Sequence, residues 1–135
     1  MRFVILLLAL VACDKGGDKP AAGAAPSVIG SAARNDVVAG WQKAGLTVSA
    51  MTADKSGAVG GDCVTGTVSG VDVVVCAFAT PDEAKAAEAK GFAWVGETTG
   101  TSLAQGAVLV AVADRRSADP SGRTINTIAT TFRGK

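Results

Sequence analysis

Few residues in this chain of 135 could carry out chemistry. There is no histidine, which excludes the Ser-His-Asp and Cys-His nucleophile systems and the usual zinc sites. Paired carboxylates remain as an acid–base system. However, Asp82 and Glu83 suit the first turn of a helix. Asp72 suits an exposed strand position and Asp114 a strand end. Each carboxylate has a structural explanation, so we expect no catalytic residues, no metal ligands and no cofactor.

The N-terminus has the layout of a secretory signal. Met1-Arg2 supplies a positive charge, and residues 3–12 are apolar throughout. This apolar run is well short of the roughly 20 residues that a helix needs to span a bilayer. We therefore expect an export signal and no permanent transmembrane segment.

The end of this stretch, Leu10-Val11-Ala12-Cys13, resembles the lipobox of bacterial lipoproteins. The resemblance implies that Leu10, Val11 and Ala12 are the signal-peptidase recognition residues and that Cys13 carries the lipid. Stable anchoring needs more than one acyl chain, and the resemblance implies a multiply acylated cysteine, palmitate being one such chain. The lipid bilayer is then one partner, reached through acylated Cys13. The expected location is the bacterial cell envelope, with the choice between inner and outer membrane left open.

Cys63 and Cys76 remain once Cys13 is acylated, and an oxidising compartment favours their pairing. The register of a hairpin supports the same bond. If Ser69-Gly70 is a two-residue turn, Cys63 lies opposite Cys76 in a non-hydrogen-bonded pair, where Cβ atoms approach most closely. A redox-catalytic role is less consistent with the sequence, because there is no C-x-x-C spacing and no adjacent basic residue. We therefore predict a structural disulfide.

The composition is close to neutral. The chain has 13 basic and 12 acidic residues, and removal of residues 1–12 takes away one basic residue, Arg2. Such a chain has no long-range field to attract nucleic acid.

Residues 14–26 (DKGGDKPAAGAAP) are rich in Gly, Ala, Pro and charge and contain no large apolar side chain. This composition is typical of a flexible tether. The expected organisation is a signal peptide over residues 1–12, a lipidated cysteine and tether over 13–26, and one domain over 27–135.

A helix is predicted from about residue 27 to Lys43, because apolar residues recur there every three or four positions. Gly45 is placed to end this helix in the left-handed conformation. Residues 46–51 alternate between apolar and polar, which predicts a short strand. Residues 52–62 form a glycine-rich connection whose spacing does not match a phosphate-binding loop.

Thr80-Pro81 predicts a second helix, since threonine caps helices and proline fits the first helical position. We expect this helix to stop at Gly91. Residues 92–95 are predicted as a strand and 96–106 as a polar loop. Residues 71–79 and 107–113 are nearly continuous apolar runs, which is typical of strands buried on both faces.

Asp119-Pro120 predicts the start of a final helix with one apolar face, which ends near Gly134. A tight hairpin favours antiparallel pairing, so the predicted fold class is α+β. We expect a four- or five-stranded, mainly antiparallel sheet with about three helices packed mostly on one face. The two continuous apolar strands leave a question: either a helix covers the second face, or that face meets a partner.

Two segments are candidate partner surfaces. One comprises Phe92 and Trp94, which would lie on the same side of a strand. The other is the basic group Arg115, Arg116, Arg123, Arg133 and Lys135, which could contact anionic headgroups. Each has a plainer alternative, a buried tryptophan and a solvated helix face. The leading hypothesis is a non-catalytic envelope lipoprotein that binds another envelope component. The alternatives are a small-molecule-binding lipoprotein and a carboxylate-dependent hydrolase.

Overall fold

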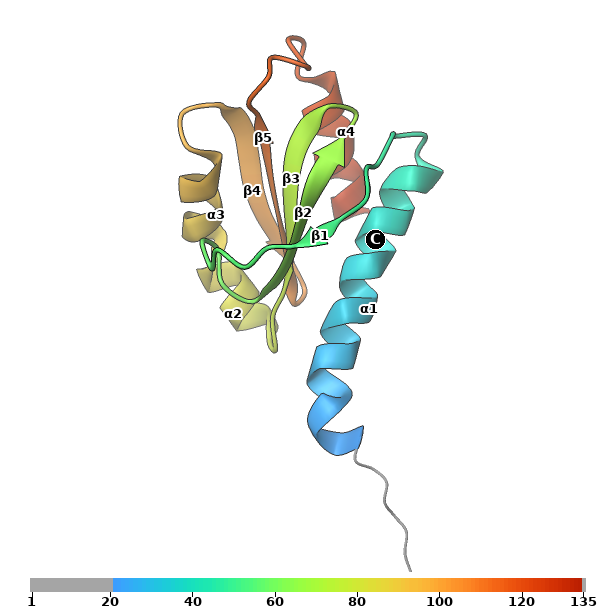
Figure 1. The fold of residues 1–135 in the computed structure, drawn as a ribbon, viewed down its shortest axis with the longest axis vertical. Coiled ribbons are helices and arrows are strands. Elements are labelled where there is room, and N and C mark those ends of the chain that lie inside the picture. The colour runs from blue at the N-terminus through green and yellow to red at the C-terminus, as the bar shows by residue number, and fades with distance from the viewer. Residues whose placement is uncertain (1–20, 135) are drawn as a thin grey trace, which may run out of the picture.

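The computed structural model describes residues 21–134, with side chains from residue 32 onward. A five-stranded antiparallel sheet lies between two pairs of helices (Figure 1). The strands are β1 (Thr52–Ala53), β2 (Asp62–Val68), β3 (Val71–Ala77), β4 (Thr99–Gln105) and β5 (Val108–Asp114), in the order β1-β2-β3-β5-β4. The helices are α1 (Ala21–Lys43), α2 (Pro81–Ala86), α3 (Glu88–Val95) and α4 (Arg123–Arg133). The predicted α+β class is confirmed.

The expected signal peptide, together with Leu10, Val11, Ala12 and Cys13, lies outside the described residues. The helix that we predicted from Ser27 begins at Ala21, within the segment expected to be a tether. Among residues 21–134, no helix has both the length and the apolar character needed to cross a bilayer.

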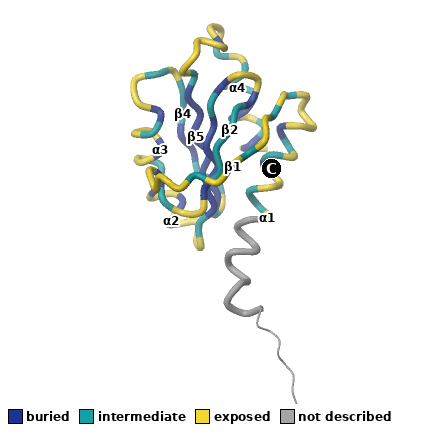
Figure 2. Tube along the Cα trace, viewed as in Figure 1, coloured by how far each residue is buried: buried dark blue, intermediate teal, exposed yellow. Residues whose placement is uncertain are grey.

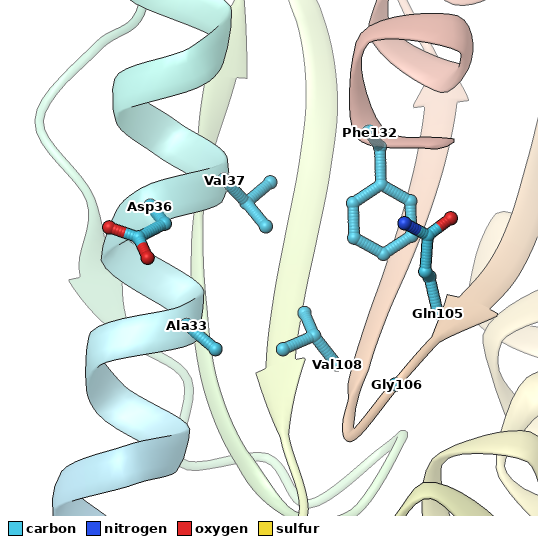
Figure 3. A pocket seen from close by; sticks show the side chains of 7 residues that line it. All are labelled: Ala33, Asp36, Val37, Gln105, Gly106, Val108 and Phe132. Atoms are coloured by element: carbon cyan, nitrogen blue, oxygen red, sulfur yellow. The ribbon is translucent and has the colours of Figure 1, made fainter. Parts of the chain in front are cut away.

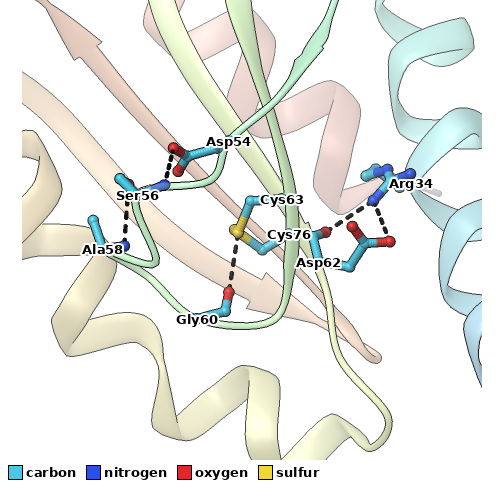
Figure 4. Close-up of a disulfide and its surroundings, with 8 residues drawn as sticks. All are labelled: Arg34, Asp54, Ser56, Ala58, Gly60, Asp62, Cys63 and Cys76. Carbon is cyan, nitrogen blue, oxygen red and sulfur yellow. Dashed lines mark hydrogen bonds and ion pairs between the residues drawn. A yellow bond between two sulfur atoms is a disulfide. The ribbon is translucent and has the colours of Figure 1, made fainter.

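The β2–β3 hairpin has the predicted register. Ser69 and Gly70 both have positive φ, of 50° and 88°, as a type I′ two-residue turn requires. Cys63 pairs with Cys76 across the strands, and their Cα atoms are 4.0 Å apart. The predicted disulfide is present, and Figure 4 shows it between the neighbouring strands β2 and β3.

Helices cover both faces of the sheet, which corrects the expectation that they pack mostly on one. On one face, Val73 and Val110 belong to a core shared with α1 and α4. On the other face, Val74 and Leu109 share a core with Val95 of α3 and the buried Val59. Helix α2 contacts β4 and β5 on this face. Alternate residues of β3 and β5 thus enter two separate cores, so both strands are buried along most of their length (Figure 2).

Helix α1 ends as predicted. Gly45 has φ of 87°, and the N–H groups of Gly45 and Leu46 donate to the carbonyls of Gln42 and Trp41, which is a Schellman motif. The indole of Trp41 is fully buried and donates to the carbonyl of Ile128 at 3.1 Å. This hydrogen bond joins α1 to α4.

Helix α4 begins at Arg123 rather than at Pro120. Asp119 still stabilises the N-terminus of α4, because the Asp119 carboxylate accepts a hydrogen bond from the N–H of Ile125 at 2.8 Å. Burial of this carboxyl raises its pKa, but the hydrogen bonds outweigh that effect and hold the pKa below its ordinary value. The hydrogen-bond donors are the backbone N–H groups of Ile125, Thr124 and Arg123 and the hydroxyl of Ser121.

Three predictions about the remaining elements were wrong. The helix after Thr80 does not stop at Gly91: it continues, after a break at Ala87, to Val95. Residues 92–95 are therefore helical, and strand β4 occupies most of the predicted polar loop. The strand predicted over residues 46–51 is reduced to one isolated bridge, and regular pairing begins only at β1.

Gly91 explains why the helix continues. A Cβ at this position would lie 2.0 Å from the hydroxyl oxygen of Ser102 on β4 and 3.3 Å from Cδ2 of Leu109. The glycine permits α3 to approach the sheet closely instead of ending the helix.

Replacement of Cys63 and Cys76 by serine should lower the free energy of unfolding by about 3 kcal/mol, because the unfolded chain loses a closed loop. Denaturant unfolding of the full chain and its double variant measures this. In the exported wild type, maleimide should label these two positions only after reduction. Labelling of both without reductant would contradict the disulfide.

The Gly91→Ala substitution distinguishes two opposite expectations for stability. Helix propensity alone predicts stabilisation by about 1 kcal/mol, whereas the clash with Ser102 predicts destabilisation by about 1–3 kcal/mol. We expect destabilisation in urea unfolding, with partial recovery in a Gly91→Ala/Ser102→Ala double variant. An increase in stability would mean that α3 does not lie this close to β4.

Candidate Arg–Trp surface

Asp72, Trp94, Arg115 and Arg116 come together at one end of the sheet and are called here the Arg–Trp surface. Asp72 is the second residue of β3, and it pairs with Ala113 of β5. The two arginines directly follow β5, and Trp94 lies in the last turn of α3. Antiparallel pairing of β3 with β5 therefore places the exit of one strand beside the entry of the other.

Asp72 is shared by both arginines. Its Oδ1 lies 2.8 Å from Nη1 of Arg116, and its Oδ2 lies 3.7 Å from Nη1 of Arg115. Arg116 also donates to the carbonyl of Gly70 at 3.2 Å. The side chain of Asp72 is 18% exposed, whereas those of Arg115 and Arg116 are 37% and 59% exposed. One carboxylate faces two guanidinium groups, so the surface has an excess positive charge.

Arg115 also holds Trp94. Its guanidinium carbon lies 4.4 Å from the centre of the indole ring, a cation–π arrangement. The same guanidinium donates a hydrogen bond to the Trp94 carbonyl in the last turn of α3, where the helix dipole favours a cation. These contacts fix the end of α3 against the β5 exit.

A hollow of about 520 Å³ adjoins these residues. Its polar walls include three threonines, Thr52 on β1 and Thr65 and Thr67 on β2. Thr52 pairs with Thr65, and Thr67 pairs with Asp72, so β1, β2 and β3 all contribute to the hollow. It is open and polar, as suits contact with a hydrophilic partner rather than enclosure of an apolar ligand.

The two predicted partner surfaces are only partly brought together. Trp94 joins Arg115 and Arg116, but Phe92 does not line the hollow and is 53% exposed. Residues two positions apart on a helix point about 200° apart, so the expectation that Phe92 and Trp94 share one side was wrong.

The predicted basic group is also divided. Arg123 and Arg133 lie at opposite ends of α4, roughly 15 Å apart at the helical rise per residue. Neither lines the hollow. Lys135 lies outside the described residues. Of the five basic residues, two contribute to the Arg–Trp surface.

Sequence reasoning missed Asp72 and the threonines as site residues. Asp72 was interpreted only as an exposed strand position. The available signal was the hairpin register itself, which places Thr67 opposite Asp72. Nothing in the sequence pattern indicated that α3 would carry Trp94 over the same end of the sheet.

A second hollow, of about 420 Å³, lies between α1, α4 and the β4–β5 turn. Figure 3 shows Val37, Val108 and Phe132 around it, with Asp36 on α1 and Gln105 at the end of β4. A third, of about 410 Å³, lies between α1 and the β1 edge, and a fourth, of about 560 Å³, between the glycine-rich connection and α2.

None of these four hollows is lined by more than one carboxylate. A carboxylate-dependent hydrolase would need two in one cleft, so that alternative gains no support from the described residues. Within residues 21–134, no three Cys, Asp or Glu side chains gather closely enough to hold a metal ion.

Comparisons with known proteins gave no relative: no family model, no curated protein and no solved structure matches this chain.

The contact between Arg115 and Trp94 can be tested by quenching. The Arg115→Ala substitution should expose the Trp94 indole and increase acrylamide quenching of tryptophan emission. Trp41 is fully buried and contributes a constant background. An Arg123→Ala variant, which removes an exposed arginine elsewhere, should leave quenching unchanged. Equal quenching in the two variants would contradict the cation–π contact.

Proposed function

We propose that the chain is an exported, lipid-anchored envelope protein whose domain binds an anionic segment of another envelope component, without catalysis. The observation that carries the binding part is the Arg–Trp surface, in which Arg115 and Arg116 share the carboxylate of Asp72 beside an open polar hollow. An anion that enters the hollow would find guanidinium donors already held in place.

Export and anchoring are supported by sequence and by redox state. The Leu10–Cys13 stretch resembles a lipobox, which implies acylation of Cys13. The disulfide between Cys63 and Cys76 agrees with an oxidising compartment, because cytosolic thiols are normally kept reduced. Anchoring would confine the domain to the membrane surface and raise its effective concentration toward partners there.

Arginine is the side chain best suited to the proposed contact. Its planar guanidinium binds carboxylates through two parallel hydrogen bonds and stacks on aromatic rings. Arg115 already stacks on Trp94, so little side-chain entropy is lost when it binds. Arg116 is the more exposed of the pair and is expected to make the first contact.

Site-specific crosslinking in cells tests this proposal. A photoreactive amino acid at Thr67, inside the hollow, should crosslink the full-length protein to one stoichiometric envelope protein. The same probe at Arg133, at the far end of α4, is the matched control. The Arg116→Glu substitution should reduce the Thr67 crosslink about tenfold or more, since it reverses a charge at a contact with an anion. Equal crosslinking from both positions would argue against a binding surface.

The anchor is tested separately by mass spectrometry of the mature protein. We expect an acylated N-terminal Cys13, and loss of membrane attachment in a Cys13→Ser variant. A mature protein that is unacylated and soluble would remove this half of the proposal without affecting the binding surface.

Small-molecule binding is the second candidate. Its specific support is the hollow between α1 and α4, where apolar walls meet Asp36 at one side. Pockets of this size and composition are typical of small-ligand sites. A metabolite that raises the melting temperature of the wild type, but not of a Val108→Trp variant that fills the hollow, would favour this candidate.

A further inference from the structure

The edge segment, residues 47–54, forms an incomplete outer strand. It contains β1, the first strand in the sheet order, which pairs with β2. Ser69 donates to the Thr47 carbonyl, and the N–H groups of Ser49 and Asp54 donate to carbonyls of β2. By the alternation of antiparallel pairing, the N–H and C=O of Ala53, which lies beside Asp54, point away from β2. Among residues 21–134, no strand pairs with this outer side, so another strand can be added there.

A β-bulge interrupts the edge segment. From the Val48–Val68 bridge to the Thr52–Thr65 pair, the edge segment has one residue more than β2. The hydroxyl of Ser49 stabilises this bulge, since it accepts the N–H of Thr67 at 2.8 Å and donates to the Ala50 carbonyl at 3.1 Å. Bulges are common at sheet edges and beside binding sites, where they limit pairing and redirect side chains.

Hollows lie on both sides of the edge segment. On the α3 side is the hollow of the Arg–Trp surface, and on the α1 side is the third hollow. Ala50, in the bulge, lines both of them. The α1-side hollow has apolar walls with polar side chains among them, and its lining residues include Arg34, Asn35, Val38, Gln42, Met51 and Val64.

Arg34 lines the α1-side hollow and has an unused donor. Its Nη1 is bonded to the carbonyl and carboxylate of Asp62, as Figure 4 shows. Its Nε is buried and has no hydrogen-bond partner among the described residues. A buried unsatisfied donor is costly, so an acceptor supplied by a bound chain would be favoured there.

We propose that the edge segment receives an extended acidic segment of the partner protein as an added β-strand. Successive side chains of a strand point to opposite faces, so alternate side chains of the added strand enter the two hollows. Acidic side chains face Arg115 and Arg116, and apolar side chains face Val38 and Met51. This inference rests on the proposed function and names the form of its partner.

The bulge sets the extent of this pairing. Regular backbone pairing is confined to the residues on the far side of the bulge, around Ala53, so the backbone supplies few hydrogen bonds. The two hollows supply the remaining contacts and the specificity, as in other complexes formed by strand addition. A polar peptide that does not alternate acidic and apolar side chains is therefore expected to bind weakly.

The test uses the purified full chain in detergent micelles and a labelled peptide that alternates glutamate and valine. Fluorescence anisotropy should show saturable binding, weakened by salt. A peptide that alternates lysine and valine should bind at least about tenfold more weakly, because its charges face the arginines. Equal binding of the two peptides would overturn the proposal.

The Ala53→Pro substitution tests the strand. Proline removes an outward N–H while leaving the bonds to β2, a position that edge strands tolerate. It should weaken peptide binding about tenfold without loss of the fold, and the peptide should slow hydrogen exchange at Ala53 in the wild type. Unchanged affinity and unchanged exchange would overturn strand addition. Arg116→Glu should weaken binding similarly, whereas Arg133→Glu, the matched control, should not.

Two further outcomes separate this inference from the proposed function. If no peptide binds but Thr67 still crosslinks to an envelope protein, strand addition is wrong and the proposed function stands. If vesicles containing anionic lipid displace the peptide from the Arg–Trp surface, that surface recognises lipid headgroups, and both proposals fail.

Discussion

The burial of β3 and β5 on both faces is the constraint on which the rest of the structure depends. These paired central strands send Val73 and Val110 into one core and Val74 and Leu109 into the other. Apolar surface on each face must be covered, because its exposure would cost roughly 25 cal/mol per Å². That requirement places α1 and α4 on one side and α2 and α3 on the other. The edges of the sheet and the ends of its strands are the parts that the helices do not need to cover.

The Arg–Trp surface follows from this arrangement. Since β3 and β5 are antiparallel neighbours, the chain that leaves β5 passes beside the start of β3, so Arg115 and Arg116 meet Asp72. Helix α3 must cover the second core through Val95, and this brings Trp94 under Arg115. Ion pairs near the surface add little to stability, and we propose that these two adjacent arginines act in recognition.

Local chemistry made part of the fold predictable from the sequence. The Ser69-Gly70 turn fixed the register of one hairpin, and with it the Cys63–Cys76 pair. The segment around Phe92 and Trp94 was mistaken for a strand, because short apolar runs with glycine on both sides do not distinguish strand from helix. The prediction that Phe92 and Trp94 share one side was wrong for the same reason, since a strand would have placed both aromatic side chains on one side. The site could not be assembled without knowing that α3 crosses the end of the sheet.

The most direct measurement of the central claim is a charge-swap cycle between Arg116 and an acidic residue of the partner. That residue is chosen from the partner segment that crosslinks to Thr67. Arg116→Glu and the reverse substitution in the partner should each weaken binding about tenfold or more, and the double variant should recover most of that loss. Such coupling between charges in contact is of the order of 1–3 kcal/mol. If the two losses simply add, Arg116 does not face the partner's acidic residue, and the account of the Arg–Trp surface is wrong.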